Sequence, residues 1–262
     1  MPLSPIEICG TLELGGSATP ALAPATPRLS TREQIAYATP RHTVLFGGTG
    51  QARMVAPILQ RRGCSIFAVY DRNRRIASPF PDVPIFHDRE GLILEVGFDR
   101  LRPENEGRPM GALVTIARGV DRLDLQSWLE TQTAWQVFSV IHDTVVFEED
   151  IEMGLGCQLL RQCGIGTGVR LGRAVIVSAK ANVEHDCVLE DGSQVGPGAV
   201  LCGNVTVGAR AFVGAGAIVK PHVTIGADAI VGMGAVVTKD VAPGITVVGM
   251  PAQLHVRDRQ SD

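Results

Sequence analysis

The chain has 262 residues, of which 45% are hydrophobic and 19% are charged, with a formal net charge of −3. This length suits one large domain or two small ones, and it is enough to bury a core. The weak negative charge, without a long basic run, argues against nucleic acid as a partner. No apolar run is long enough to span a membrane and no secretory signal is recognisable, so we expect a cytoplasmic protein.

Aromatic residues are scarce at 5%, whereas glycine is abundant at 30 residues. This combination indicates tight, repeated turns and not a bulky aromatic core. The cysteines form no Cys-x-x-Cys pair, so we expect small buried thiols in a reducing compartment. They are Cys9, Cys64, Cys157, Cys163, Cys187 and Cys202.

Residues 1–40 form a Pro/Ala-rich extension, and residues 255–262 form a C-terminal tail. Within the extension, Ala18–Pro27 is expected to be extended or disordered. Ile6–Leu14 alternates loosely, as an edge strand would, and Ser30–Glu33 has the spacing of a capping box before a short helix. We assign this arm no function.

Strands and helices alternate over residues 41–140, which predicts a small parallel sheet with right-handed crossovers. The predicted strands are Thr43–Phe46, Cys64–Tyr70, Ala112–Ile116 and Trp135–Val140, and the predicted helices are Gln51–Arg62 and Leu123–Thr131. An irregular, proline-rich stretch separates the second strand from the third. Gly47–Gly50 joins the first strand to the first helix, where backbone N–H groups favour phosphate. The loop lacks the full dinucleotide fingerprint, so NAD is not expected.

Residues 141–254 repeat with a period of six. Every sixth residue from Phe147 to Val237 is apolar, sixteen in succession. The position two before each is Ala, Val, Cys, Ile or Ser, and the position after is Gly in eight of the sixteen cases. Three short strands and three turns then make a triangular coil of about 18 residues. The sequence therefore predicts a left-handed parallel β-helix of about five coils.

The repeat assigns a place to each kind of residue. The aliphatic residue fills the corner of the prism, and the small residue packs beside it. We expect the glycines, such as Gly196 and Gly208, to permit turn angles that a Cβ would resist. An α-helix is excluded, because its apolar residues would recur about every 3.6 positions and so many glycines would be costly.

The chain resembles a known family at four segments, Asn182–Leu189, Gly196–Ala199, Leu201–Val205 and Val248–Ala252. These are similar to the bacterial sugar acyltransferases of the sialic-acid O-acyltransferase-like group, in which a small Rossmann-like domain precedes the β-helix. That group includes the nucleotide-sugar N-acetyltransferases that make bacillosamine and perosamine. The resemblance implies transfer of an acetyl group from acetyl-CoA to an amino group of a nucleotide-linked sugar, directly within a ternary complex.

Acyl transfer from a thioester to an amine needs a base, an oxyanion donor and a groove for the acyl carrier. His185 is the natural base, because an imidazole exchanges its proton near neutral pH. Asp186 or Glu184 could hold the other ring nitrogen. A coil of about 18 residues stacks Gly203 over His185, so its N–H lies about one strand spacing, ~4.8 Å, from the histidine backbone. The resemblance implies that Asp186 is the carboxylate that holds the other ring nitrogen of His185, and that the backbone amide of Gly203 stabilises the oxyanion.

The resemblance also implies a homotrimer, with acetyl-CoA lying in a groove between adjacent prisms and held largely by backbone groups. The positions that match its contacts are Gln194, Ala215 and Met233. The family often has a second histidine where this chain has Gln194. Glutamine can donate a hydrogen bond there, but it cannot act as an acid or base.

In the family the loop after the first strand holds the nucleotide. The matching residues here are Gly48, Thr49, Gly50, Gln51 and Asp71. The family's loop ends in Gly-His-Gly, where this chain has Gly50–Ala52, and the acidic residue that often follows Asp71 is Arg72 here. The nucleotide and the sugar therefore stay open, as does the alternative that the loop only packs strand against helix.

Other functions remain open on the sequence. A zinc site of the γ-carbonic-anhydrase kind needs three histidines from neighbouring coils, but the series of hexads from Phe147 to Val237 holds only His185 and His222, so we expect no metal. A sugar O-acetyltransferase would use the same base and groove on a hydroxyl. A paralogue without activity could bind nucleotide-sugars or act as a scaffold, and His185 would then be a solvated turn residue.

Overall fold

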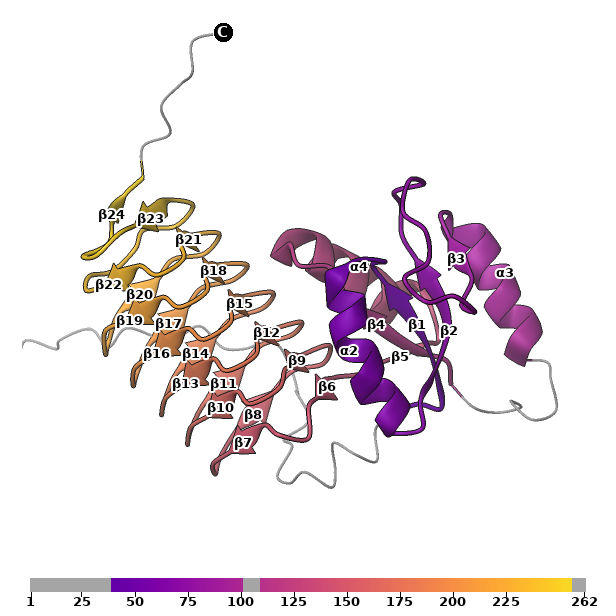
Figure 1. Ribbon diagram of the computed structural model, residues 1–262, viewed down its shortest axis with the longest axis horizontal. Coiled ribbons are helices and arrows are strands. Elements are labelled where there is room, and N and C mark those ends of the chain that lie inside the picture. The colour runs from indigo at the N-terminus through magenta and orange to yellow at the C-terminus, as the bar shows by residue number, and fades with distance from the viewer. Residues whose placement is uncertain (1–38, 101–108, 256–262) are drawn as a thin grey trace, which may run out of the picture.

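The computed structural model describes residues 39–100 and 109–255, which form a sheet-and-helix domain followed by a prism of stacked coils (Figure 1). Cys9, the predicted edge strand at Ile6–Leu14 and the predicted helix after Ser30 lie outside these ranges. In the described ranges, no helix is long and apolar enough to cross a membrane.

The first domain is a five-stranded parallel sheet in the order β3-β2-β1-β4-β5. Its strands are β1 (His42–Phe46), β2 (Ser65–Tyr70), β3 (Ile85–Phe86), β4 (Gly111–Val114) and β5 (Gln136–Val137). Its helices are α2 (Gly50–Arg61), α3 (Arg89–Arg100) and α4 (Gly119–Gln132). This is the Rossmann-like arrangement that the alternation of strands and helices predicts.

Both faces of this sheet are covered by apolar side chains. Leu92 of α3 and Leu129 of α4 pack against one face. On the other face, Ile58 of α2 packs in a cluster that also contains Leu160 and Ala179 from the coils. The helix α2 therefore lies between the sheet and the prism, and this apolar cluster, separate from the core inside the prism, joins the two domains.

Two features of the first domain differ from the sequence prediction. The helix α3 and the short strand β3 occupy the stretch predicted to be irregular, and the Asp88 carboxylate accepts a 2.7 Å hydrogen bond from the Gly91 N–H at the start of α3. The cap at Asp88, followed by the apolar residues Leu92 and Val96 one turn apart, is the sequence pattern that indicates this helix. The predicted strand Trp135–Val140 is split, because β5 ends at Val137 and the next strand pairs within the prism.

The second domain is a left-handed β-helix with three faces. The β6 face contains β6 (Val140–Ile141), β9 (Gln158–Leu159), β12 (Ile176–Val177), β15 (Gln194–Val195), β18 (Phe212–Val213), β21 (Ile230–Val231), β23 (Thr246–Val248) and β24 (Gln253–Leu254). The β7 face contains β7 (Val146–Phe147), β10 (Gly164–Ile165), β13 (Asn182–Val183), β16 (Val200–Leu201), β19 (Ile218–Val219) and β22 (Val236–Val237). The β8 face contains β8 (Glu152–Met153), β11 (Arg170–Leu171), β14 (Val188–Leu189), β17 (Thr206–Val207) and β20 (Thr224–Ile225).

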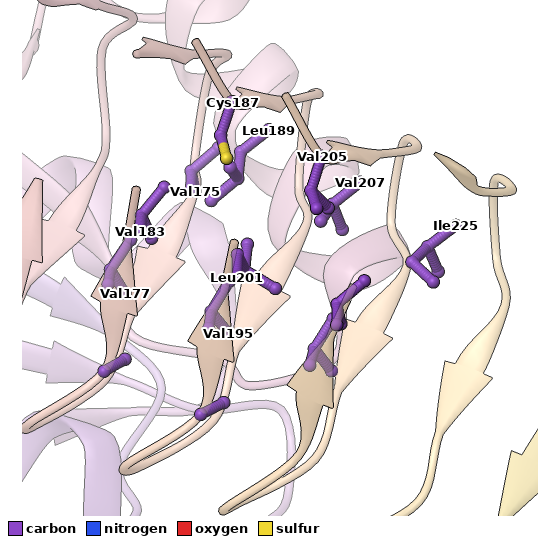
Figure 2. Close-up of a cluster of buried hydrophobic side chains, with 14 of the residues drawn as sticks. Val175, Val177, Val183, Cys187, Leu189, Val195, Leu201, Val205, Val207 and Ile225 are labelled. Atoms are coloured by element: carbon purple, nitrogen blue, oxygen red, sulfur yellow. The ribbon is translucent and has the colours of Figure 1, made fainter. Parts of the chain in front are cut away.

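The coils repeat every 18 residues, as the period of six predicts. On the β7 face, Gly164 pairs with Asn182 and Asn182 with Val200, each in parallel register. The residues at every sixth position from Phe147 to Val237 are buried except Phe147, which is partly buried. Figure 2 shows members of this series, such as Val183 and Leu201, pointing into the prism together with small residues two positions earlier. Hydrophobic burial along the axis therefore holds the coils together.

The prediction that the glycines after the aliphatic residues permit unusual turn angles is wrong. Gly196 and Gly208 do not have a positive φ. They are small because the next coil is too close: a Cβ on Gly208 would stand 2.5 Å from the Ala227 nitrogen, and one on Gly196 would stand 2.7 Å from the Ala215 nitrogen. These glycines therefore permit backbone contact between coils.

The left-handed turn position lies two residues further on. Every sixth residue from Asp150 to Gly234 has a positive φ, and nine of these residues are not glycine. Ala174, with φ of 54°, and Asp186, with φ of 58°, are examples. The hydrogen bonds between turns, such as Asp186 N–H to Thr167 oxygen at 2.9 Å, offset the cost of ~1–2 kcal/mol that a side chain adds in this region.

The thiols agree with the prediction of small buried residues in the part of the chain that is described. Cys64, Cys157, Cys163 and Cys187 are buried, and Cys202 is half-buried. Burial raises the pKa of the first three thiols to about 12 and that of Cys187 to about 11. Thiolates are therefore scarce at neutral pH, which suits packing and not reactivity.

Two substitutions test the different roles of the glycines that follow the aliphatic residues and of the glycines at the left-handed turn position. Gly208→Ala forces a methyl group onto the backbone of the next coil and is expected to lower the free energy of unfolding by about 3 kcal/mol or more. Gly216→Ala, at a φ of 67° with no atom within 4 Å of the new Cβ, should cost only about 1–2 kcal/mol. Urea denaturation of both variants measures the difference. Equal losses would contradict this assignment of the two positions.

Candidate active site

His185 lies on the edge where the β7 and β8 faces meet, in the turn between β13 and β14. Its side chain is 59% exposed, and Nδ1 lies 2.9 Å from Oδ2 of Asp186. Because a carboxylate only accepts hydrogen bonds, Nδ1 carries the proton in this pair. In the neutral ring, Nε2 is then the unprotonated nitrogen, which is the atom that a general base uses.

The structure distinguishes between the two carboxylates that flank His185. Glu184 accepts a hydrogen bond from the Asn182 side chain, whereas Asp186 contacts the imidazole. The positive φ of Asp186 belongs to the left-handed turn series. Its Oδ1 lies over Gly168 of the preceding coil, where a Cβ would stand 2.7 Å away. The same 18-residue step that relates His185 to Gly203 would have identified Gly168.

Gly203 lies directly against the imidazole. A Cβ on this residue would overlap Nε2 and would stand 2.5 Å from Cε1 of His185. The turns of the two coils are joined by a 2.9 Å hydrogen bond from the Asn204 N–H to the His185 oxygen. Glycine at 203 is therefore what allows the ring to lie on the face of the next coil.

The Gly203 amide is available for a ligand. Its carbonyl oxygen accepts a 3.2 Å hydrogen bond from the His222 N–H, but its own N–H donates to no atom of residues 39–100 and 109–255. An unpaired N–H beside a base is the arrangement that stabilises an oxyanion during acyl transfer.

The residues predicted to hold acetyl-CoA lie elsewhere on the same prism. Ala215 and Met233 occupy successive turns on the edge between the β6 and β7 faces, and Met233 is 80% exposed. Gln194 is half-buried in β15 of the β6 face. One chain therefore does not bring these three residues to His185, because the β7 face separates the two edges.

The glycine loop of the first domain is fixed by hydrogen bonds. The Gly47 N–H donates to the Tyr70 oxygen at 2.7 Å, and the Gly48 N–H donates to Oδ2 of Asp71 at 2.9 Å. Thr49 and Gly50 are exposed at the start of α2, whose first turn has no acidic residue. This leaves the helix N-terminus open to an anion.

Asp71 and Gln51 have structural partners in addition to their predicted role. Oδ1 of Asp71 accepts a 2.9 Å hydrogen bond from the Asn73 N–H, so both carboxylate oxygens order the loops. Gln51 Nε2 donates to Oε1 of Gln158 at 2.8 Å and so faces the prism. Gln158 is fully buried, and nothing in its sequence context marked it as a contact between domains.

A metal site finds no support in the part of the chain that the structure describes. Its histidines, cysteines and carboxylates include no group of three that could hold a metal ion. His222 is exposed in the turn of the coil after Gly203.

Comparison with known proteins identifies hexapeptide repeats and similar acetyltransferases. The model of the bacterial transferase hexapeptide (six repeats) matches residues 186–221 and 204–239. No curated protein matches the chain significantly. Among solved structures, a histidine-to-alanine variant of GDP-perosamine N-acetyltransferase from Caulobacter crescentus, in complex with CoA and GDP-perosamine, is 29% identical with a TM-score of 0.73. The match covers 82% of this chain and 97% of that one.

Two further solved structures are similar to this chain over almost the same share of its length. The acetyltransferase domain of PglB from Neisseria gonorrhoeae, in complex with acetyl coenzyme A, is 25% identical with a TM-score of 0.71, over 82% of this chain and all (100%) of that one. WeeI from Acinetobacter baumannii is 28% identical with a TM-score of 0.66, over 81% and 99% of the two chains. This chain is an acyltransferase that contains hexapeptide repeats. The fold of this acyltransferase, a Rossmann-like domain before a β-helix, is the one that the resemblance implied.

A methyl group at Gly203 tests whether the contact between Gly203 and His185 matters for turnover. Gly203→Ala overlaps only the end of a flexible side chain, so the imidazole swings away and the fold is kept. We expect kcat to fall by about 10²-fold, since a displacement of ~1 Å at a reacting group has that effect. The melting temperature should change little, and Gly244→Ala, where no atom lies within 4 Å of the new Cβ, is the control. Full turnover of Gly203→Ala would remove Gly203 from the site.

Proposed function

We propose that the protein transfers the acetyl group of acetyl-CoA to an amino group of a nucleotide-linked sugar, directly within a ternary complex. The observation that carries the proposal is the imidazole of His185, held by Asp186 and lying against Gly203, whose N–H donates to no atom of the described residues. Further support comes from similar acetyltransferases whose structures contain CoA, acetyl coenzyme A or GDP-perosamine.

The chemistry balances with the groups at hand. The amine nitrogen attacks the thioester carbonyl and forms the C–N bond, while Nε2 of His185 takes the proton that the nitrogen releases. The Gly203 N–H stabilises the oxyanion of the tetrahedral intermediate. When the C–S bond breaks, the CoA thiolate takes the proton from the imidazolium. Asp186 keeps the ring in the tautomer that this sequence of steps requires.

We further propose a homotrimer in which acetyl-CoA lies between two prisms. Ala215 and Met233 of one chain and His185 of the next would then line a single groove. The outward side chains of the β7 face between these edges include Val146, 60% exposed, and Ile218, 45% exposed, which suits packing against a second prism. Sedimentation of a monomer at micromolar concentration would contradict this arrangement.

We assign the nucleotide to the loop of Gly48, Thr49 and Gly50. Exposed backbone at the start of α2, without an acidic residue in its first turn, suits the phosphates of a nucleotide. Asp71 orders this loop through the Gly48 N–H, so its contact with the nucleotide would be secondary to that role. Gln51 contributes by joining the loop to the prism.

The assay is CoA release from acetyl-CoA with a panel of UDP-, GDP- and dTDP-linked amino sugars, with mass spectrometry of the product. His185→Ala should lower kcat by about 10²–10⁴-fold, the usual contribution of a general base. His42→Ala is the matched control, because His42 lies at the opposite end of β1 from the glycine loop.

Two outcomes would contradict this assignment. Full turnover of His185→Ala would exclude His185 as the base. Turnover with hydroxyl acceptors and with no amine would change the assignment to O-acetylation.

A further inference from the structure

Arg122 of α4 is a charged side chain with no exposed surface. All five of its N–H groups donate to backbone oxygens. Nε bonds Ala174 at 2.7 Å, Nη1 bonds Ile116 at 2.8 Å and Ala117 at 2.6 Å, and Nη2 bonds Gly192 at 2.7 Å and Ser193 at 3.3 Å. Burial lowers the pKa of this guanidinium to about 10, so it stays protonated at neutral pH. Its charge is stabilised by carbonyl dipoles and not by a carboxylate.

The two acceptors of Nη1 belong to the loop that follows β4. Ile116 and Ala117 adjoin Thr115, whose hydroxyl donates to the Gly47 oxygen at 2.8 Å. A Cβ on Gly47 would stand 2.8 Å from the Thr115 oxygen, so the two loops touch along their backbones. Arg122 therefore holds the segment that supports the proposed nucleotide loop.

The other three acceptors belong to the prism. Ala174 and Gly192 are the left-handed turn residues of two successive coils, on the edge between the β8 and β6 faces. Gly192 and Ser193 lie in the same coil as His185. One guanidinium thus bonds the loop beneath the nucleotide site and the coil that carries the base.

A second buried contact fixes the same strand end. Gln158, also fully buried, donates from Nε2 to the Val114 oxygen at 2.8 Å and accepts from Gln51. The N-terminus of α4 also reaches backbone distance of the prism, since a Cβ on Gly119 would stand 2.5 Å from the Gly192 oxygen. A guanidinium is planar and its five N–H groups point in fixed directions. Arg122 therefore fixes the orientation of the loop relative to the coils as well as the contact between them.

We propose that Arg122 is a positioning residue for acyl transfer, which fixes the nucleotide loop relative to the coil of His185. The inference rests on the proposed function. Prisms in an assembly would pack through their coils, so a loop fixed to its own coil is also fixed relative to His185 of a neighbouring chain. Arg122 would then determine how the amine meets the thioester, and not how tightly either substrate binds.

The test compares Arg122→Met and Arg122→Lys with Arg173→Met. Arg173 also joins α4 to the coils, through Glu130 at 3.2 Å and Asp191 at 2.9 Å, but it is 41% exposed and does not touch the loop after β4. We expect kcat of Arg122→Met to fall by about 10²-fold, because reacting groups held ~1 Å out of place lose that much rate. Calorimetric affinity for the nucleotide-sugar and KM for acetyl-CoA should not change. Arg122→Lys should recover part of the rate, and Arg173→Met should keep all of it.

All rates are measured well below the melting temperature of each variant. Should Arg122→Met not fold, Gly119→Ala serves instead, because its methyl group pushes α4 away from Gly192 while keeping the arginine. Normal kcat with only a lower melting temperature would overturn the inference and leave the proposed function intact. No turnover by the unmodified enzyme with any nucleotide-linked amino sugar would overturn both.

Discussion

Successive coils of the prism are joined by backbone hydrogen bonds at every strand, as from Gly164 N–H to the Ala181 oxygen and from Asn182 N–H to the Ala199 oxygen, between β7-face strands whose paired residues are 18 apart. This stacking brings backbone against backbone at ~4.8 Å, and at positions such as Gly196 and Gly208, where the chain leaves a strand, it leaves no room for a Cβ. The glycines after the aliphatic residues, the left-handed turns and the aliphatic core all follow from that one spacing. So does the contact between His185 and Gly203.

The proposed active site uses the same positions that the fold requires. Asp186 occupies a left-handed turn position that elsewhere holds Lys180 or Arg210, and its φ of 58° is set by the coil. Gly203 is glycine because an imidazole, and not the next coil's backbone, lies where its Cβ would be. The backbone of a site built this way is rigid, since moving Asp186 or Gly203 would require moving a coil. The first domain is attached to that rigid body through the buried polar groups of Arg122 and Gln158.

The sequence predicted the prism well because each step of six residues puts one side chain into the core, and the 18-residue coil brought His185 to Gly203. It gave the wrong reason for glycines such as Gly208, because contact between coils is invisible along the chain. The helix α3 was missed beside a proline-rich stretch, although Asp88 caps it. Arg122 could not be predicted, since a lone arginine on an amphipathic helix normally lies at the surface. Whether Gln194, Ala215 and Met233 meet His185 depends on a second chain, about which one sequence says nothing.

The proposed mechanism of acyl transfer depends most on where the thioester lies. A crystal structure of the protein with bound CoA measures this directly. The proposed mechanism predicts that the CoA sulfur lies beside Gly203, within about 3 Å of the position that the oxyanion would occupy in front of the Gly203 N–H. Nε2 of His185 should then face the solvent-accessible side, from which the amine would attack. A pantetheine chain that ends at another edge of the prism, with His185 and Gly203 both facing solvent, would contradict it.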